Sequence, residues 1–526
     1  MSSLSRTVPR SGRTVLLGGL VADGSGGDPF LGDVLVTEER IDAVLPVRER
    51  PAGGYDAEII DCTDRVIAPG FVDIHTHSDL SLLAYPDNQS RITQGVTTEV
   101  VGNCGMTPAP GNADAAGLAR VISTIDVTPD LEWSWRDVAG WLQVLEDTPT
   151  ATHVAAHVGH GSARFAAAGA STEPLDAEQS AVLEHELEDA LAAGAVGVSV
   201  GLMYAPGEAA GARELATVAR AVAAQDGVLS AHLRDYRTSA LTGSIDEMAD
   251  AVREDGPRLQ ISHLRGIGGG DGFAGVLTHL ERLRESLDIA ADAYPYVHGH
   301  TTLIQLLPPS LRAAGPDAAV AACTSDPATV AGILAGAGYA PDEVVIMKAA
   351  RTPEAVGKDL TDAPGDPWRR LVDLLVANEG LVDVALESGL WDDVDLALST
   401  PWISIASDGT ALDRTHRASA AHPRSWGAFS SGFRRMRRLG IPLGETVRRL
   451  STAPAARAGI RSGLTPGHRA DVVVLDPLTF DSPATFRQPS QPSTGLDHVL
   501  VGGTAVIASG HPTGARPGTL LRKGQQ

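Results

Sequence analysis

The feature that most constrains the fold is a regular alternation between short apolar runs and alanine-rich stretches. Apolar runs such as TTEVVG, THVAAHVG, VLSAHL and LQISHL lie between helical stretches such as DAEQSAVLEHELEDALAAG. Continuous apolar strands separated by helices indicate a parallel sheet with helices on its faces. Seven or eight such repeats between residues 69 and 461 favour a closed (β/α)8 TIM-like barrel over an open sheet.

The two chain ends differ from this middle region. Residues 1–68 and 462–526 consist of short strand-like runs separated by turns, such as TVLLGGLVADG and RADVVVLDP. Because terminal segments of this kind often meet in one sheet, we expect a small β-sandwich domain built from both ends. Residues 301–400 interrupt the barrel pattern with proline-rich turns and helical pieces. We expect them to form an inserted lid over the barrel mouth, with a solvated helical decoration as the alternative.

The composition excludes several classes of protein. The 526 residues include 65 acidic and 42 basic side chains, and the net charge of −23 argues against nucleic acid or an anionic membrane as a partner. Three cysteines are too few for a disulfide scaffold, and no apolar run is long enough to predict a transmembrane helix. The early run TVLLGGLV is too short for a signal peptide, so we expect a cytoplasmic protein. The sequence leaves the oligomeric state open.

Side chains that bind metals recur where the apolar runs end. They are His75, His77, Cys104, His232, His263 and Asp408. A bare HxH is usually an exposed strand end, and a single buried histidine is more often a hydrogen-bonded core residue. Positions that share one register, however, converge on the face of a barrel where active sites are built. Imidazole, thiolate and carboxylate together suit Zn²⁺.

This order of residues resembles the amidohydrolase superfamily, with HxH after the first barrel strand, single histidines on two later strands and an aspartate on the last. Many members bridge two metals with a carbamylated lysine on the fourth strand. Here the expected segment, GAVGVSVGLMYAPGE, has no lysine, and all three lysines of the chain follow His263. Cys104 is the best candidate to complete the site, because a thiolate is a strong zinc ligand and can bridge.

Further motifs narrow the resemblance to the N-acyl-D-amino-acid deacylases (D-aminoacylases). They are GNCG around Cys104, HVGHG at 157–161, GLMYAPG at 201–207, ISH at 261–263, DAYPY at 292–296, SDG at 407–409 and HPRSWG at 422–427. The resemblance implies that Cys104, His232 and His263 hold one tight zinc ion. His75, His77 and Asp408 would flank it, as ligands of a second, weaker metal or as part of the catalytic apparatus.

The resemblance also implies an activity: hydrolysis of the amide bond of N-acyl-D-amino acids to a carboxylic acid and a free D-amino acid. Asp408 would take a proton from metal-activated water and return it to the leaving amine. The alternative for Asp408 is a turn or N-cap role within Ser-Asp-Gly. The small-molecule substrate and its product carry a carboxylate, for which a forked cation is expected.

Arg424, in HPRSWG, is the residue that the resemblance assigns to this carboxylate, together with Tyr294 and Arg265. Three features depart from the family. Arg265 replaces a more usual lysine, His300 stands where a serine is usual, and the loop at 409–423 is longer. All three departures lie near the expected pocket, so the side-chain and acyl-chain preference stays open.

Three further aromatic and histidine residues have two possible roles each. Tyr204 either lines the site or packs in the core, and His157 and His160 suit loop or supporting roles better than metal ligation. Alternative functions are another amide hydrolase on the same scaffold, such as a D-specific dipeptidase or a cyclic-amide hydrolase, or a non-catalytic barrel. The missing lysine disfavours the usual cyclic-amide hydrolases, and a non-catalytic barrel should have lost some of its metal ligands.

Overall fold

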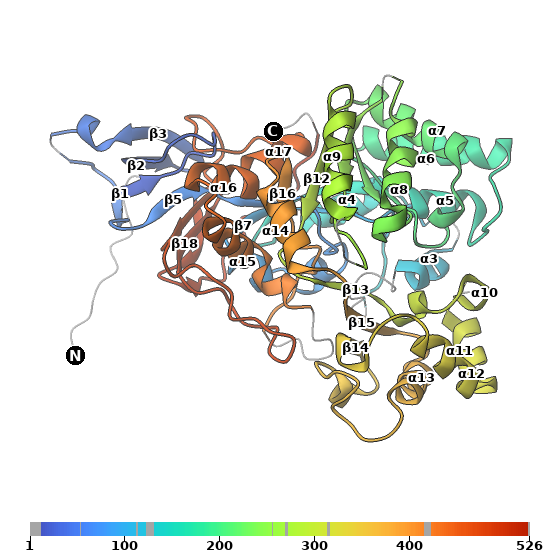
Figure 1. Cartoon of the computed structure of the whole chain (residues 1–526). Helices are drawn as coiled ribbons and strands as arrows, with labels where there is room; N and C mark the ends of the chain where they lie inside the picture. Colours follow the sequence, from blue (N-terminus) through green and yellow to red (C-terminus); the bar gives the residue numbers. More distant parts are fainter. Residues whose placement is uncertain are drawn as a thin grey trace.

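The computed structural model describes residues 12–52, 54–111, 114–122, 131–254, 256–268, 272–312, 316–414 and 422–523 (Figure 1). Its centre is a row of eight strands, each paired in parallel with its neighbours. The strands are β6 (Phe71–Asp73), β7 (Val96–Val101), β8 (His153–Gly159), β9 (Gly197–Gly201), β10 (Val228–His232), β11 (Arg258–Ile261), β12 (Ile289–Ala293) and β16 (Ile403–Ile405).

The two edge strands of this row approach each other just beyond their carboxyl ends. The amide of Asp408 donates to the carbonyl of His75 over 2.9 Å, and the amide of His77 donates to the carbonyl of Gly409 over 2.8 Å. These bonds join the continuation of β6 to that of β16 and nearly close the row of strands into a barrel. The predicted (β/α)8 barrel is confirmed.

Helices follow the strands of this row along the chain. They are α1 (Ser81–Ala84), α2 (Gln89–Ile92), α3 (Ala115–Ile122), α4 (Val138–Asp147), α5 (His160–Ala168), α6 (Ala177–Ala192), α7 (Ala212–Ala224), α8 (Thr238–Ala251), α9 (Gly272–Arg284), α14 (Trp391–Ser399), α15 (Arg424–Arg438), α16 (Leu443–Leu450) and α17 (Thr452–Arg457). Helix α6 shows why such segments are helical. Asp176 and Gln179 form a reciprocal capping box at its start, and Leu183, Leu187 and Leu191 bury one face at four-residue spacing.

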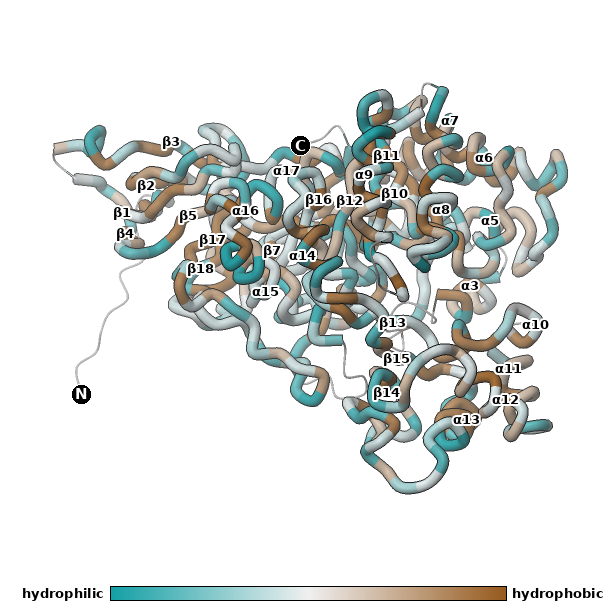
Figure 2. The backbone as a smooth tube through the Cα atoms, in the orientation of Figure 1, coloured by the Kyte–Doolittle hydropathy of each residue, from teal (hydrophilic) through white to brown (hydrophobic). Residues whose placement is uncertain are grey.

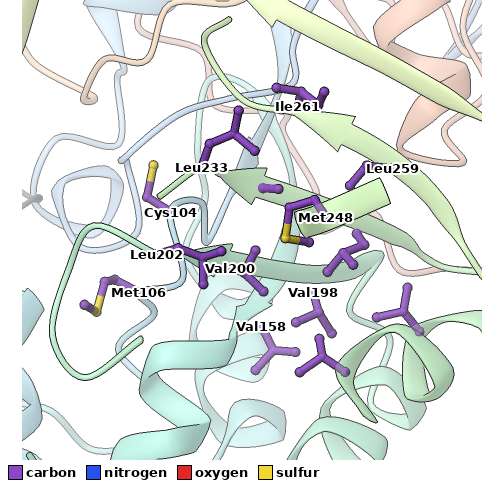
Figure 3. Packing of buried hydrophobic residues seen from close by; sticks show 14 of the residues in the cluster. Cys104, Met106, Val158, Val198, Val200, Leu202, Leu233, Met248, Leu259 and Ile261 are labelled. Atoms are coloured by element: carbon purple, nitrogen blue, oxygen red, sulfur yellow. The ribbon is translucent and has the colours of Figure 1, made fainter. Parts of the chain in front are cut away.

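The core of the barrel is continuous from strand to strand. Figure 2 shows the strands of the central region as largely apolar segments, and Figure 3 shows Val158 of β8 beside Val198 and Val200 of β9. All three valines are fully buried. Cys104 belongs to the same cluster and lies at its end, near Leu202 and Leu233. The candidate metal ligand Cys104 therefore lies at one end of the buried apolar core of the barrel.

The two chain ends form one separate β domain, as expected, and its strands make a single nine-stranded sheet. Its strands are β1 (Arg13–Val21), β2 (Phe30–Thr37), β3 (Arg40–Pro46), β4 (Glu58–Asp61), β5 (Val66–Pro69), β17 (Val472–Leu475), β18 (Leu496–Val501), β19 (Thr504–Ala508) and β20 (His511–Pro512). Antiparallel pairing of β5 with β17 joins the two ends. Alternate residues serve two cores: Val472 and Val474 pack within the domain, whereas Val473 and Leu475 pack with Phe429 of the barrel. We propose residues 1–68 with 462–526, and 69–461, as the bounds of the two domains.

A compact unit is inserted between β12 and α14, and in Figure 1 it projects from the barrel as the yellow and pale orange segment. It consists of a three-stranded sheet and four helices: β13 (His298–Thr302), β14 (Val344–Ala349), β15 (Val382–Glu387), α10 (Pro309–Arg312), α11 (Pro316–Ser325), α12 (Pro327–Ala335) and α13 (Pro367–Ala377). It has its own apolar core around Leu334, Leu371 and Val384. No single helix of the described residues has the length and hydropathy of a membrane span; the bent pair α11–α12 passes that test by length and composition alone.

Candidate metal centre and active site

The six predicted metal ligands meet at the carboxyl ends of the barrel strands. The Sγ of Cys104 lies 3.3 Å from Nδ1 of His232, 3.4 Å from Nε2 of His75 and 3.6 Å from Nε2 of His263. His263 and His232 are themselves 2.9 Å apart between Nε2 and Nδ1. A thiol in contact with three imidazoles, all located at or just beyond the carboxyl ends of four strands, is the donor set expected around zinc.

Asp408 completes the group from the opposite side. Its Oδ1 lies 3.0 Å from Nε2 of His77 and 3.6 Å from Nε2 of His75. Among the described residues, three sets of side chains bring their ligand atoms within 4.8 Å of one another: His75 with His77 and Cys104, Cys104 with His232 and His263, and His75 with His263 and Asp408. Since these sets overlap, the cluster has donors for one metal or for two.

Burial sets the charge state of these donors in the protein without a metal. It lowers the pKa of His232 to about 3 and those of His75 and His263 well below the usual range, so their lone pairs are free for a cation. Burial also raises the pKa of the Cys104 thiol well above its usual value. A positive ion at this position would compensate the cost of ionising the thiol, which is a further reason to regard the cluster as a metal site.

Asp408 behaves differently from the other buried acids nearby. Burial alone would raise its pKa, but the Arg424 guanidinium, followed by His263 and His77, holds it well below its usual range. The Nη1 of Arg424 lies 2.8 Å from Oδ2 of Asp408. The carboxylate is thus kept ionised in a site where its side chain is only 9% exposed.

Local backbone geometry positions three of the donors. Cys104, His263 and Asp408 all adopt left-handed conformations, with φ of 54°, 34° and 50°. Each costs a non-glycine residue about 1–3 kcal/mol and persists only where the surroundings enforce it. The residue before Cys104 helps to hold this conformation, because the side-chain amide of Asn103 donates to the carbonyls of Thr76 and Val100.

Asp292 is a supporting residue to which the sequence alone assigned no role. Its Oδ1 accepts the amide of His263 over 2.7 Å and lies 3.6 Å from Nδ1 of His75, while its Oδ2 accepts Nε2 of Gln260 over 2.8 Å. This carboxylate therefore holds the backbone of one candidate ligand, His263, and faces the imidazole of another, His75. The available signal was position, since Asp292 ends an apolar strand just as the metal-binding candidates do.

Among the residues expected to bind substrate, Arg424 contacts Asp408 and also lies over Tyr294. The guanidinium carbon of Arg424 is 5.0 Å from the centre of the Tyr294 ring, and Nη1 of Arg265 donates to the Tyr294 hydroxyl over 2.6 Å. A small cavity beside His263 has Arg265 and Tyr294 in its wall. His300 comes from β13 of the insertion, with Nε2 3.8 Å from Oδ2 of Asp383.

Tyr204 packs edge-on against His232, with the ring centres 4.9 Å apart, and Tyr236 packs similarly on the other side at 5.2 Å. His160 lies outside the cluster, where its Nε2 is 2.7 Å from Glu214. His157 is buried within β8. Of the long 409–423 loop, residues 415–421 lie outside the described part of the chain.

Comparison with known proteins agrees with this geometry. A model of the amidohydrolase family matches residues 58–260. The N-acyl-D-glutamate deacylase of Alcaligenes xylosoxydans xylosoxydans is 31% identical over 525 residues, which cover 97% of this chain and 96% of that protein. The D-aminoacylase of the same organism is 30% identical and covers 97% of both chains. The chain belongs to the D-aminoacylase family of amidohydrolases. It is therefore an amide hydrolase, and the non-catalytic alternative falls away.

Solved structures of D-aminoacylases extend the similarity to three dimensions. The N-acyl-D-glutamate deacylase of Bordetella bronchiseptica, crystallised with zinc and a phosphonate mimic of the tetrahedral intermediate, has a TM-score of 0.80 and 29% identity. The aligned region covers 97% of this chain and 99% of that one. Another D-aminoacylase structure, with the same TM-score and coverage, addresses a binuclear metal centre. Proteins of this family thus bind metals. In this chain, β9 and the residues that follow it up to 208 contain no lysine.

Proposed function

We propose that this D-aminoacylase family member is a zinc-dependent deacylase of N-acyl-D-amino acids. The observation that carries the proposal is the contact of the Cys104 thiol with three buried imidazoles, beside a carboxylate held ionised by Arg424. The proposed reaction cleaves the amide to release a carboxylic acid and a free D-amino acid. A cytoplasmic location and the absence of nucleic-acid and membrane partners remain predictions from composition.

The donor set fits zinc. We assign Cys104, His232 and His263 to one tight ion, with His75, His77 and Asp408 at a second, weaker position or in direct catalytic roles. Among the described residues, Nε2 of His232 is buried without a hydrogen-bond partner, so this ring is not held by another part of the protein through that atom. When bound, zinc supplies a Lewis acid that polarises a carbonyl and makes water acidic.

Asp408 moves the proton. Because Arg424 keeps the carboxylate ionised, Asp408 can accept a proton from the attacking water. His77, 3.0 Å from the same carboxylate, holds it in orientation. The protonated acid then donates to the leaving nitrogen, so the amine departs neutral and the carboxylate is restored. General acid–base catalysis of this kind contributes about 10²–10⁴-fold to a rate.

Arg424 and Tyr294 are the residues that we assign to the substrate carboxylate. The forked guanidinium matches two carboxylate oxygens, and its position over the Tyr294 ring limits its freedom. Binding there would set the amide carbon beside the metal cluster. Tyr204 and His300 are proposed to line the rest of the pocket. His300 is near enough to Arg424 and Asp408 for their charges to act on its pKa, although burial is the main reason that its pKa falls to about 3.

One assay tests the proposal. Zinc-loaded protein is incubated with N-acetyl derivatives of D- and L-amino acids, D-dipeptides and a hydantoin, and the free amine or ring-opened acid is measured. We expect release of amine from N-acetyl-D-amino acids. Turnover of only L-forms, only dipeptides or only cyclic amides would replace the proposed substrate class, and no turnover of any of them would remove it.

A further inference from the structure

Both terminal nitrogens of Arg265 donate hydrogen bonds to other residues of the protein. Its Nη1 donates to the Tyr294 hydroxyl over 2.6 Å, and its Nη2 donates to the carbonyl of Val297 over 3.0 Å and to the hydroxyl of Ser388. The guanidinium is half-buried, and its Nε is buried. From the sequence, this side chain was expected to bind substrate, but both of its terminal nitrogens already donate hydrogen bonds within the protein.

The partners of Arg265 lie on the two segments that connect the insertion to the barrel. Val297 immediately precedes β13, and Ser388 immediately follows β15. The same Val297 carbonyl also accepts the amides of Ser388 and Gly389, over 3.3 and 3.0 Å. The entry and exit of the insertion thus meet at one carbonyl, and Arg265 reaches both from a position two residues beyond His263.

Two glycines lie beside the guanidinium, and one of them leaves room for it. A Cβ added to Gly299 would lie 2.6 Å from Nη1 of Arg265, and the three heavy atoms nearest to it all belong to Arg265. A Cβ on Gly389 would lie 3.5 Å from Nη2. Neither glycine has a positive φ, so at Gly299 it is the space needed by Arg265, and not the backbone, that calls for glycine.

We propose that Arg265 is a positioning residue that clasps the insertion, residues 298–387, to the mouth of the barrel and aims the Tyr294 hydroxyl into the site. The planar fork reaches Tyr294 on one side and both connecting segments on the other. A lysine carries its donors on a single nitrogen and cannot span these groups. The kinetic consequence rests on the proposed deacylase activity; the effect on the insertion does not.

Hydrogen–deuterium exchange of the zinc-loaded full-length protein tests the clasp without a substrate. For Arg265→Lys and Arg265→Ala, we expect amide exchange in 298–302 and 382–387 to accelerate about tenfold or more, because hydrogen bonds from a charged donor are lost. Exchange in the barrel strands should stay unchanged. Wild-type exchange in Arg265→Lys would overturn the proposal, since a simple substrate cation would be conserved by that change.

Gly299 provides a second test. It compares the same substitution in two backgrounds, so its result does not depend on the stability of one variant. Gly299→Ala should accelerate exchange in the same two strands when residue 265 is arginine, and should have little further effect in the Arg265→Ala background, where the clashing atoms are gone. Gly275→Ala, on α9 with nothing within 4 Å of the new Cβ, is the matched control. Equal effects of Gly299→Ala in both backgrounds would refute the clasp.

Kinetics distinguishes positioning from a structural role. If Arg265 acts through Tyr294, then Arg265→Lys and Tyr294→Phe should each raise KM, and the double variant should be no worse than the more impaired single variant. Multiplicative effects on KM would show that Arg265 acts on substrate separately from Tyr294 and would overturn this part of the proposal. Failure of the deacylase assay in the wild type would leave the exchange results unaffected.

Discussion

Arg424 and Asp408 form a buried ion pair, with 2.8 Å between Nη1 and Oδ2, at the edge of the metal-binding cluster. The pair links two assigned tasks, because the cation that would bind the substrate carboxylate also keeps the catalytic carboxylate ionised. Substrate binding and proton transfer are thereby placed on adjacent side chains.

Asp408→Asn should abolish most turnover while the protein keeps its tightly bound zinc. The amide cannot accept a proton, so we expect kcat to fall about 10²–10⁴-fold. Metal content after dialysis should stay at the wild-type level, since Cys104, His232 and His263 remain. Asp250→Asn, an exposed aspartate paired with Arg253, is the control for the same chemical change. Retention of most turnover would show that Asp408 is not the base.

Arg424→Gln should weaken binding of substrates that carry a free carboxylate. Loss of a charged pair of hydrogen bonds predicts an increase in KM of about 10–100-fold. The decisive measurement compares each N-acyl-D-amino acid with its carboxamide, because only the acid can use the guanidinium. We expect the preference of the wild type for the acid to disappear in the variant. A preserved preference would assign the carboxylate to another residue.

Cys104→Ala should lose zinc. Removing a supporting residue of a metal site typically costs 10–100-fold in affinity, so loss of the thiolate ligand itself should cost about 100-fold or more. Metal analysis after equilibrium dialysis against a chelator measures the change. Cys62→Ala, which removes a buried thiol of the small β domain, should bind zinc like the wild type. A full metal complement in Cys104→Ala would contradict the ligand assignment.

The barrel and its cluster could be predicted because both leave local signals. Apolar runs mark the strands, and His75, Cys104 and Asp408 follow those runs directly. His75 and His77 were expected at the end of the first strand. β6 ends at Asp73 and the chain bends at 74–75, but it still pairs with residues 408 and 409. The predicted position of the two histidines was still useful, because backbone hydrogen bonds to residues 408 and 409 hold them at the barrel end although the strand has already ended.

The insertion could not be predicted to the same depth. Its sheet includes β13, whose sequence HGHTT has no apolar alternation, and its strands pair across as many as 89 residues between His298 and Glu387. The contacts of Arg265 have the same origin, since Ser388 is 123 positions away. Contacts between residues so far apart in the sequence depend on tertiary packing, which a local sequence pattern does not reveal.

Asp471 should hold the small β domain to the barrel in a pH-dependent way. Its Oδ1 lies 3.1 Å from Nε2 of His153 on β8 and accepts the amide of Gly502, while its Oδ2 accepts Nε of Arg469 over 2.8 Å. Burial alone would raise its pKa, but His153 and then Arg469 hold it well below the usual value. A carboxyl group whose pKa is lower in the folded state stabilises the protein above its unfolded-state pKa of about 3.9. This contribution is lost as the pH falls through the folded-state value.

Asp471→Asn should therefore lower the free energy of unfolding by about 2–3 kcal/mol at pH 7. The difference from the wild type should narrow once the pH falls below about 4, where the carboxylate of the unfolded chain begins to gain a proton while the native one stays ionised. Thermal or denaturant unfolding at a series of pH values measures it, with Asp42→Asn, an exposed change on β3, as the control for losing one negative charge. A difference that is independent of pH would mean that packing, and not the ionised carboxylate, accounts for the role of Asp471, because only an ionisable group couples unfolding to the uptake of a proton.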